Sequence, residues 1–178
     1  MTPAIKTERL RLYAPYHRTF DIERQVDWLN DKQVVKYSEQ RHHQHTWDTQ
    51  WKYLCSFDHV SSHIWEISHD YAGRHGRYDY PIGTITVYRD LVNKAADIGL
   101  MIGNREVWGS GYGCEAWEAV MGFLFADNVQ KIEAGTVSGN DAMLKIMLKS
   151  GMVPEGIRRN RIIIDGTPRD VLLMGKIK

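Results

Sequence analysis

Three glycines at alternate positions, Gly109, Gly111 and Gly113, join a β-rich run at 96–103 to the most apolar helical stretch of the chain. That stretch shows a helical stripe widened to a core-facing side, formed by Ala116, Trp117, Val120, Met121 and Leu124. Glycine lets a phosphate approach the backbone, and the free N–H groups of a first helical turn attract negative charge. The loop therefore predicts a pyrophosphate cradle, although a tight connection without a ligand explains the glycines alone equally well.

Two common nucleotide-binding motifs do not fit this loop. A P-loop needs GxxxxGK[ST], and the lysine is absent here. A dinucleotide fingerprint needs GxGxxG after the first strand of a βαβ unit, and this loop comes late in the chain. The spacing therefore disfavours nucleoside triphosphates and NAD as ligands.

Bulk properties narrow the setting. The 178 residues fit one domain, 1–178, and 23 basic residues nearly cancel 22 acidic ones, so we expect neither nucleic acid nor membrane as a partner. Cys55 and Cys114 show no disulfide or zinc spacing. The chain starts without a signal-peptide pattern and has no run of about 18 apolar residues. We therefore expect a soluble, cytoplasmic protein.

Periodicity predicts a mixed order of strands and helices. A strand over 5–13 precedes two helices over 19–30 and 46–57. An antiparallel meander follows, with strands at 63–68, 81–92 and 96–103 separated by polar segments at 69–80 and 93–95. After the glycine loop come a helix, a strand over 131–137, a helix over 140–150 and two strands around Asp165-Gly166. This order predicts an α/β (α+β) fold.

The stretch WGSGYGCEA resembles the WGxGY(A/G)xEA signature of the GNAT superfamily of N-acetyltransferases, in the branch of the RimJ/RimL-type ribosomal-protein N-terminal acetyltransferases. Further matches are TERLRL near the start, WLND at 28–31, Asn140, Lys149-Ser150-Gly151-Met152 and Glu155-Gly156. Met152 replaces the usual Phe. The resemblance covers nearly the whole chain.

The resemblance implies a GNAT-like fold, with a mostly antiparallel central sheet, one splayed strand pair and about four flanking helices. It also implies acetyl-CoA as co-substrate, with no metal. The pantetheine arm would pair with the backbone near Met101, Ile102 and Gly103, and Asn140 would bond to it. The pyrophosphate would lie on the N–H groups of Trp108, Gly109, Ser110, Gly111, Tyr112 and Gly113, with Glu115 supporting this cradle.

Acetyl transfer requires an uncharged amine, and this determines how much a base contributes. A lysine-type amine with a pKa of about 10.4 pays about 4.6 kcal/mol to be neutral at pH 7, whereas an α-amine pays about 1 kcal/mol. Asp97 is the first candidate base, since some relatives carry a basic Glu there; a solvated Asp at a strand start is the alternative. Glu66 is a weaker candidate. Met143 and Met147 occupy the positions of the family's usual acid, so water, Tyr112 or the proton of the incoming amine would protonate the thiolate.

The loop between the first two helices often lines the acceptor site in this branch. His42, His43, Trp47 and Trp51 are therefore candidate substrate contacts, with a polar loop and helical core packing as the alternative. The HHxH run at 42–45 lacks the carboxylate or cysteine spacing that would complete a metal site.

Three functions remain open from the sequence. The first is acetylation of a small amine, such as a nucleotide-linked amino sugar, and the second is acetylation of protein N-termini. The third is non-catalytic acyl-CoA binding, which the missing tyrosine acid keeps open. The strand edges expected after the last strands favour a homodimer.

Overall fold

A computed structural model describes residues 4–15, 20–73 and 76–178. All described strands belong to one sheet in the order β1-β2-β3-β4-β5-β6-β8-β7. In chain order the elements are β1 (Ile5–Lys6), β2 (Leu10–Tyr13), α1 (Ile22–Asn30), the 3-10 turn η1 (Glu39–His42), α2 (Trp47–Cys55), β3 (Ser62–Gly73), β4 (Gly76–Asp90), β5 (Ala95–Ile102), the 3-10 turn η2 (Arg105–Val107), α3 (Tyr112–Ala126), β6 (Lys131–Val137), α4 (Asp141–Lys149), β7 (Val153–Ile164) and β8 (Thr167–Ile177).

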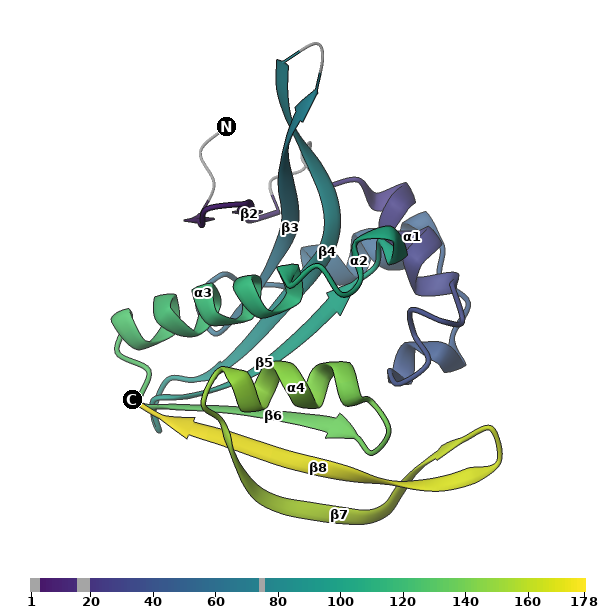
Figure 1. Ribbon diagram of the computed structural model, residues 1–178, viewed down its shortest axis with the longest axis vertical. Coiled ribbons are helices and arrows are strands. Elements are labelled where there is room, and N and C mark those ends of the chain that lie inside the picture. The colour runs from purple at the N-terminus through teal and green to yellow at the C-terminus, as the bar shows by residue number, and fades with distance from the viewer. Residues whose placement is uncertain (1–3, 16–19, 74–75) are drawn as a thin grey trace.

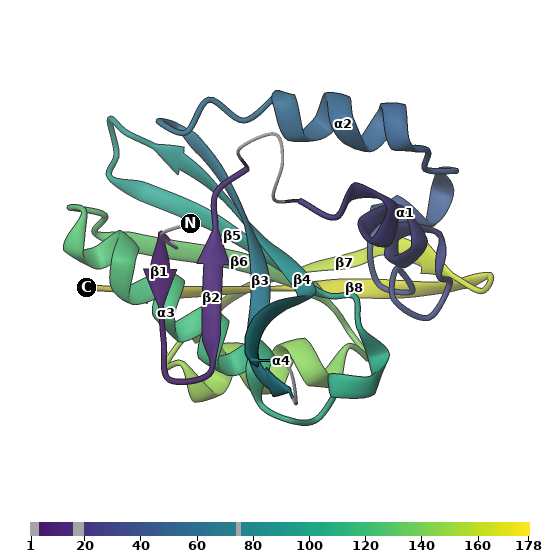
Figure 2. The same cartoon turned by 90° about the horizontal axis from the view of Figure 1, so that it is seen from above.

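Helices cover both faces of this sheet. α1 and α2 lie over one face, and α3 and α4 lie over the other (Figures 1 and 2). The main core lies under α3, where Trp117, Val120 and Leu124 pack on buried residues of β2 to β6. A smaller cluster of Ile22, Leu54, Phe57 and Ile64 holds α1 and α2 to the opposite face. The predicted mostly antiparallel sheet with four flanking helices is confirmed.

The predicted splayed strand pair is β5 and β6. They run parallel and pair over only three positions, from Ala95 opposite Lys131 to Asp97 opposite Glu133. Beyond Asp97 the two strands diverge (Figure 1). β6 instead continues its pairing along its other edge, where β8 matches it over its whole length.

Two predicted segments differ from the structure. The 5–13 strand is a short hairpin, because the chain reverses between β1 and β2, which pair antiparallel. The prediction of a polar separator at 69–80 was wrong, since β3 and β4 continue through it and pair as far as Gly73 opposite Gly76. Ladder hydrogen bonds satisfy the backbone there regardless of side-chain polarity.

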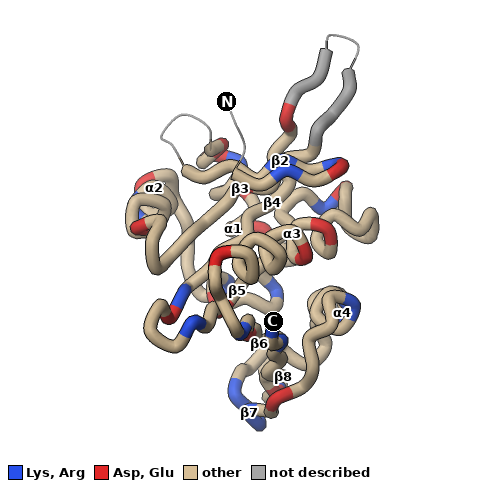
Figure 3. The backbone as a smooth tube through the Cα atoms, turned by 90° about the vertical axis from the view of Figure 1, so that its left-hand side faces the viewer, with Lys and Arg blue, Asp and Glu red and all other residues tan. Residues whose placement is uncertain are grey.

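The helix starts follow capping chemistry. Asp21 accepts a hydrogen bond from the Arg24 amide at the start of α1, and Thr46 forms a capping box with Thr49 at the start of α2. The predicted beginning of the first helix, Thr19, lies outside the described residues. Within the described ranges no helix is both long and apolar enough to cross a membrane. Segments with Lys or Arg and segments with Asp or Glu are scattered among each other over the described chain (Figure 3).

Trp28 of α1 packs directly on Gly103 at the end of β5. A Cβ atom at Gly103 would lie 2.0 Å from the Trp28 ring, so Gly103→Ala forces the ring to move. We expect a loss of about 1 to 3 kcal/mol in the free energy of unfolding. Gly122→Ala is the matched control, since nothing lies within 4 Å of its Cβ position, and we expect it to gain about 0.5 to 1 kcal/mol. Urea denaturation measures both, and equal changes would contradict this account of Gly103.

Candidate active site

The glycine loop presents unpaired amides at the start of α3. Gly109 and Gly111 have positive φ angles of 81° and 84°, which only glycine adopts without strain. Among the described residues no acceptor is paired with the amides of Gly109, Gly111, Tyr112, Gly113 and Cys114. The space next to Gly109 is open to at least 4 Å. Several N–H groups at a helix N-terminus form a site for an anion.

The amides of Trp108 and Ser110 are already used within the loop. They donate to the carbonyls of Arg105 and Val107 at 3.2 Å each. The Trp108 indole donates to the Ile102 carbonyl at 2.8 Å and so holds the loop to the end of β5. Of the predicted cradle, the amides available to a phosphate are therefore those of Gly109 and of residues 111–113.

Arg9 and Glu115 connect this loop to the start of β2. The Arg9 guanidinium donates to Glu115 at 2.6 Å and to the Ser110 carbonyl at 3.0 Å, and it lies over the Tyr112 ring. Partial burial opposes ionisation of Glu115, but hydrogen bonds from Thr7 and Arg9 lower its pKa below the usual value. The Glu115 carboxylate therefore stays charged and holds Arg9, which in turn holds the loop at the Ser110 carbonyl. Neither contact uses the amides at the start of α3.

Groups expected to hold a pantetheine arm lie along the splay. The Gly103 amide already donates to Ile82 of β4 at 2.9 Å, whereas the β5 edge beyond Asp97 is not paired with β6. Asn140 caps α4 by accepting from the Met143 amide at 3.3 Å. The described residues provide no acceptor for the Asn140 side-chain nitrogen. The assignment of Met101, Ile102, Gly103 and Asn140 to pantetheine stays a prediction.

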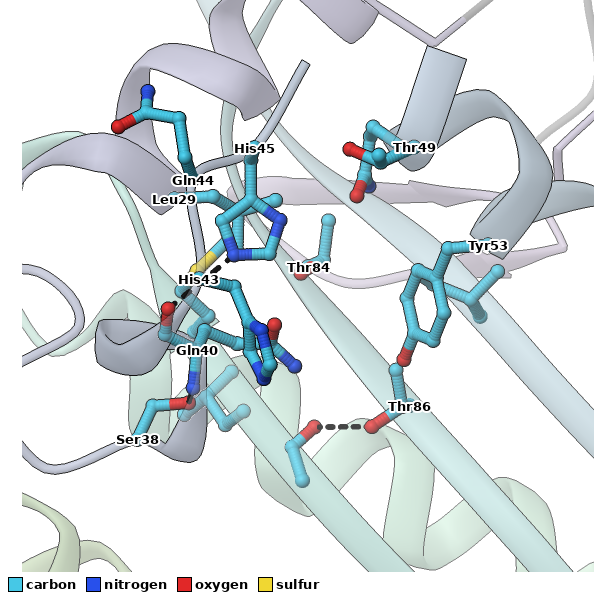
Figure 4. Close-up of a pocket in the computed structure, with 15 residues that line it drawn as sticks. Leu29, Ser38, Gln40, His43, Gln44, His45, Thr49, Tyr53, Thr84 and Thr86 are labelled. Atoms are coloured by element: carbon cyan, nitrogen blue, oxygen red, sulfur yellow. Dashed lines mark hydrogen bonds between the residues drawn. The ribbon is translucent and has the colours of Figure 1, made fainter. Parts of the chain in front are cut away.

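A cavity of about 450 Å³ lies on the face of the sheet that α1 and α2 cover. Its floor is β4 and β5, and its walls are the 38–45 segment on one side and α2 on the other (Figure 4). Asp, Glu, Lys and Arg are absent from the residues that line it, which are Leu29, Ser38, Gln40, His43, Gln44, His45, Thr49, Gln50, Tyr53, Ile64, Thr84, Thr86, Gly99, Leu100 and Met101. The lining therefore mixes polar groups with a larger apolar surface, and it holds no Asp, Glu, Lys or Arg side chain.

Of the four predicted acceptor contacts, the structure places only His43 in this lining. His42 is exposed and lies 3.9 Å from the Glu39 carboxylate. Trp47 and Trp51 stack on each other one helical turn apart, with ring centroids 5.3 Å apart. The helical period turns Thr49, Gln50 and Tyr53 toward the cavity instead. The helical period groups Thr49, Gln50 and Tyr53 on one side of α2, and this polar side is the sequence signal for them, although the sequence does not show what that side faces.

Asp97 lies at the closed end of the splay rather than in its open part. It is the last β5 residue paired with β6, opposite Glu133, and it is two positions from Gly99 in the cavity floor. Although the Asp97 side chain is partly open to solvent, desolvation by the surrounding atoms, and then the negative charge of Glu133, raise its pKa above the usual value. Residues two apart on a strand share a face, so Asp97 lies on the cavity side.

Glu66 is a second carboxyl near the cavity, on β3 opposite Thr84 of the floor. Its side chain is only 2% exposed. Burial raises the pKa of Glu66 to about 7, although hydrogen bonds from Gln25 and the Asp21 amide oppose the shift. The carboxyl is therefore poised to titrate near neutral pH.

No hydroxyl group replaces the missing acid on α4. Met147 is buried in the core and Met143 packs against it. The Tyr112 hydroxyl lies 3.0 Å from His69 Nε2, close to Arg9 and away from the cavity lining. Within the described part of the chain, no three His, Cys, Asp or Glu side chains gather as a metal site.

The sequence model of the acetyltransferase (GNAT) domain matches residues 9–153, which is most of the chain. The chain belongs to the GNAT acetyltransferase family. This confirms the family that the glycine signature indicated. No curated protein matches the sequence of this GNAT chain.

Solved structures share the fold of this GNAT domain at low sequence identity. An acetyltransferase (GNAT family) from Bacillus anthracis is 20% identical, with a TM-score of 0.78 and 97% of each chain covered. RimL, a ribosomal L7/L12 α-N-protein acetyltransferase in complex with coenzyme A, is 13% identical, with a TM-score of 0.81 over 96% of this chain and 95% of that one. Spermidine N-acetyltransferase from Vibrio cholerae, in complex with CoA and spermine, is 17% identical, with a TM-score of 0.81 and 96% of each chain covered.

The raised pKa of Glu66 predicts a pH-dependent stability. The folded state holds the Glu66 proton more tightly than the unfolded state does. The contribution of Glu66 to the free energy of unfolding is therefore fully present below about pH 4.5 and is lost as the pH rises through about 7. Glu66→Gln removes this loss, so we expect the variant to be more stable than wild type at pH 8 by up to about 3 kcal/mol. Chemical denaturation at pH 5 and pH 8 measures this, and an equal effect at both values would contradict the assignment.

Proposed function

We propose that this GNAT enzyme transfers an acetyl group from acetyl-CoA to the amine of a small polar molecule, such as a nucleotide-linked amino sugar. The observation that carries the proposal is a cavity with amide, hydroxyl and imidazole groups but no Asp, Glu, Lys or Arg in its lining, whose floor includes Gly99, Leu100 and Met101 of the splayed strand. The same strand therefore borders both the splay and the cavity.

Binding of acetyl-CoA is supported at the glycine loop. The free amides of Gly109, Gly111, Tyr112 and Gly113 offer donors to a pyrophosphate, and the helix N-terminus favours its charge. The unpaired β5 edge near Met101 and the free side-chain nitrogen of Asn140 suit an arm rich in amides. RimL and the spermidine enzyme are described as complexes with CoA, and their shared fold agrees with this role.

The lining chemistry favours a hydroxylated acceptor over a polyamine. Amides and hydroxyls offer hydrogen bonds to the hydroxyls of a sugar, whereas several ammonium groups would need carboxylates that this lining lacks. The lining also lacks the Lys or Arg that a diphosphate would need, so only the sugar of a nucleotide-linked acceptor would lie in the cavity. A volume of about 450 Å³ is in the range of pockets that enclose a small ligand. These features support a small-molecule amine as the acceptor.

Asp97 is the proposed general base. The amine nitrogen attacks the thioester carbonyl, the C–S bond breaks and the thiolate takes a proton. The amine arrives as an ammonium group and, before it attacks, gives one proton through water to Asp97, whose raised pKa brings it closer to neutrality, where a base is most effective. Since Met143 and Met147 provide no acid, the thiolate takes its proton from water or from the amine.

Thiol release from acetyl-CoA tests the proposed activity across four amine classes. The panel holds nucleotide amino sugars, polyamines, aminoglycosides and N-terminal peptides, and we expect the sugars to turn over fastest. Gly111→Trp puts a bulky side chain at a positive φ in the cradle, so we expect it to abolish acetyl-CoA binding as measured by calorimetry. Fastest turnover of peptides would instead favour N-terminal acetylation, and no binding of acetyl-CoA by wild type would contradict the proposal.

Substitutions at the carboxylate pair test the base. We expect Asp97→Asn to lower kcat about 100-fold or more at pH 7. Desolvation is the larger cause of the raised pKa of Asp97 and the negative charge of Glu133 the smaller one, so Glu133→Gln removes part of the shift and the acidic limb of kcat/KM should move to lower pH. Glu23→Gln, an exposed carboxyl on α1, is the control and should leave the limb in place. An unchanged limb in Glu133→Gln would exclude Asp97 as the base.

A further inference from the structure

A buried chain of three polar side chains leads from β3 to the cavity. Glu66 Oε2 accepts a hydrogen bond from Gln25 Nε2 at 3.2 Å, and Gln25 Oε1 accepts one from Gln50 Nε2 at 2.7 Å. Gln25 is 0% exposed and Gln50 is 4% exposed. Gln50 is also the one member of the chain that lines the cavity. Buried polar groups of this kind are costly unless each is paired, which calls for a reason for their presence.

The carboxylate determines the direction of this chain. Burial raises the pKa of Glu66 to about 7, and above that pH the ionised carboxylate only accepts hydrogen bonds, so Gln25 turns its nitrogen toward Glu66 as it does in the structure. The oxygen of Gln25 then faces Gln50, which must donate with its own nitrogen. Gln50 Oε1 is left over, and the described residues offer it no donor. The chain therefore presents an acceptor at the wall of the cavity.

The other groups around Glu66 leave this direction unchanged. The Asp21 amide also donates to Glu66 Oε2 at 3.2 Å, as it would to any acceptor at the start of α1. Arg24 is held by the Asp21 carboxylate at 2.9 Å and by the Tyr80 hydroxyl at 2.7 Å, so it forms no hydrogen bond to Glu66. Tyr13 is the residue opposite Glu66 on β2.

We propose that Gln50 recognises a hydrogen-bond donor of the acceptor molecule, an amine N–H or a hydroxyl, and that Glu66 and Gln25 are positioning residues that keep its oxygen directed at the cavity. This inference rests on the proposed function, because it assigns the cavity to the acceptor. It explains why carboxylates are absent from the lining: the charge acts from behind, through two amides. A neutral acceptor at the wall suits a polar, donor-rich molecule.

Nuclear magnetic resonance of the side-chain amides tests the chain without any turnover. We expect the amide protons of Gln25 and Gln50 to exchange far more slowly than those of the exposed Gln33. Titration with uridine diphosphate glucosamine should shift the Gln50 signal, and Gln25→Leu and Glu66→Gln should raise the titration midpoint severalfold. Fast exchange at Gln50, or no shift of its signal with any amine of the panel, overturns the proposal.

Steady-state kinetics tests recognition. We expect Gln50→Leu to raise the KM for uridine diphosphate glucosamine about tenfold, the typical effect of one lost hydrogen bond, while the KM for acetyl-CoA stays within about twofold. Glu66→Gln should raise the same KM to a smaller extent, because its amide permits either direction of the chain. Gln33→Leu removes an exposed amide of equal size and should change neither constant.

The outcomes separate this inference from the proposed function. An unchanged acceptor KM in Gln50→Leu overturns the inference while the acetyltransferase activity stands. If no amine turns over but uridine diphosphate glucosamine still shifts Gln50, the inference about the chain stands and the proposed function falls. Equal increases in both KM values would indicate a general structural effect and overturn the recognition role.

Discussion

The early divergence of β5 and β6 is the constraint on which the rest of the site depends. Strand edges in the middle of a sheet normally pair, because unpaired N–H and C=O groups are costly when they are buried. Here the pairing ends after Asp97 and Glu133, and β6 keeps its partner only on the β8 side. The gap is therefore a place where an extended ligand with its own amides can complete the sheet. The glycine loop follows directly from the strand that borders this gap.

β5 serves both faces of the sheet. Ile98 is buried in the core under α3, whereas Gly99 and Met101 line the cavity on the α1 and α2 side. This arrangement follows from the strand itself, because successive side chains point to opposite faces of a sheet. The Trp108 indole and the Arg9–Glu115 pair then fix the loop through side chains and carbonyls, so the amides of the cradle stay free. One strand thus contributes to both the core and the cavity lining.

The two carboxyls near the cavity have different surroundings. Asp97 lies beside Glu133 at the closed end of the splay, where desolvation and a like charge raise its pKa. Glu66 is buried beneath α1 and communicates with the cavity only through amides. Neither carboxyl is among the residues that line the cavity. The amides and hydroxyls of the lining distinguish one ligand from another by the positions of its hydrogen-bond donors rather than by its charge.

The sequence by itself determined the family, the order of most elements and the position of the glycine loop at the start of α3. These depend on local signals: the WGSGYGCEA stretch, the period-two strands and the helical stripe on either side of it. Local signals failed at 69–80, where pairing between β3 and β4 overrides polar composition, and at 5–13, where the chain folds back on itself. Which residues line the cavity was decided only by tertiary structure. Trp47 and Trp51 stack on each other, whereas Gln50 and Tyr53 reach the cavity, because Leu54 of α2 packs against Ile22 and Ile64 and so sets the rotation of the helix about its axis. The chain from Glu66 to Gln50 joins residues from three separate elements, and no sequence spacing encodes it.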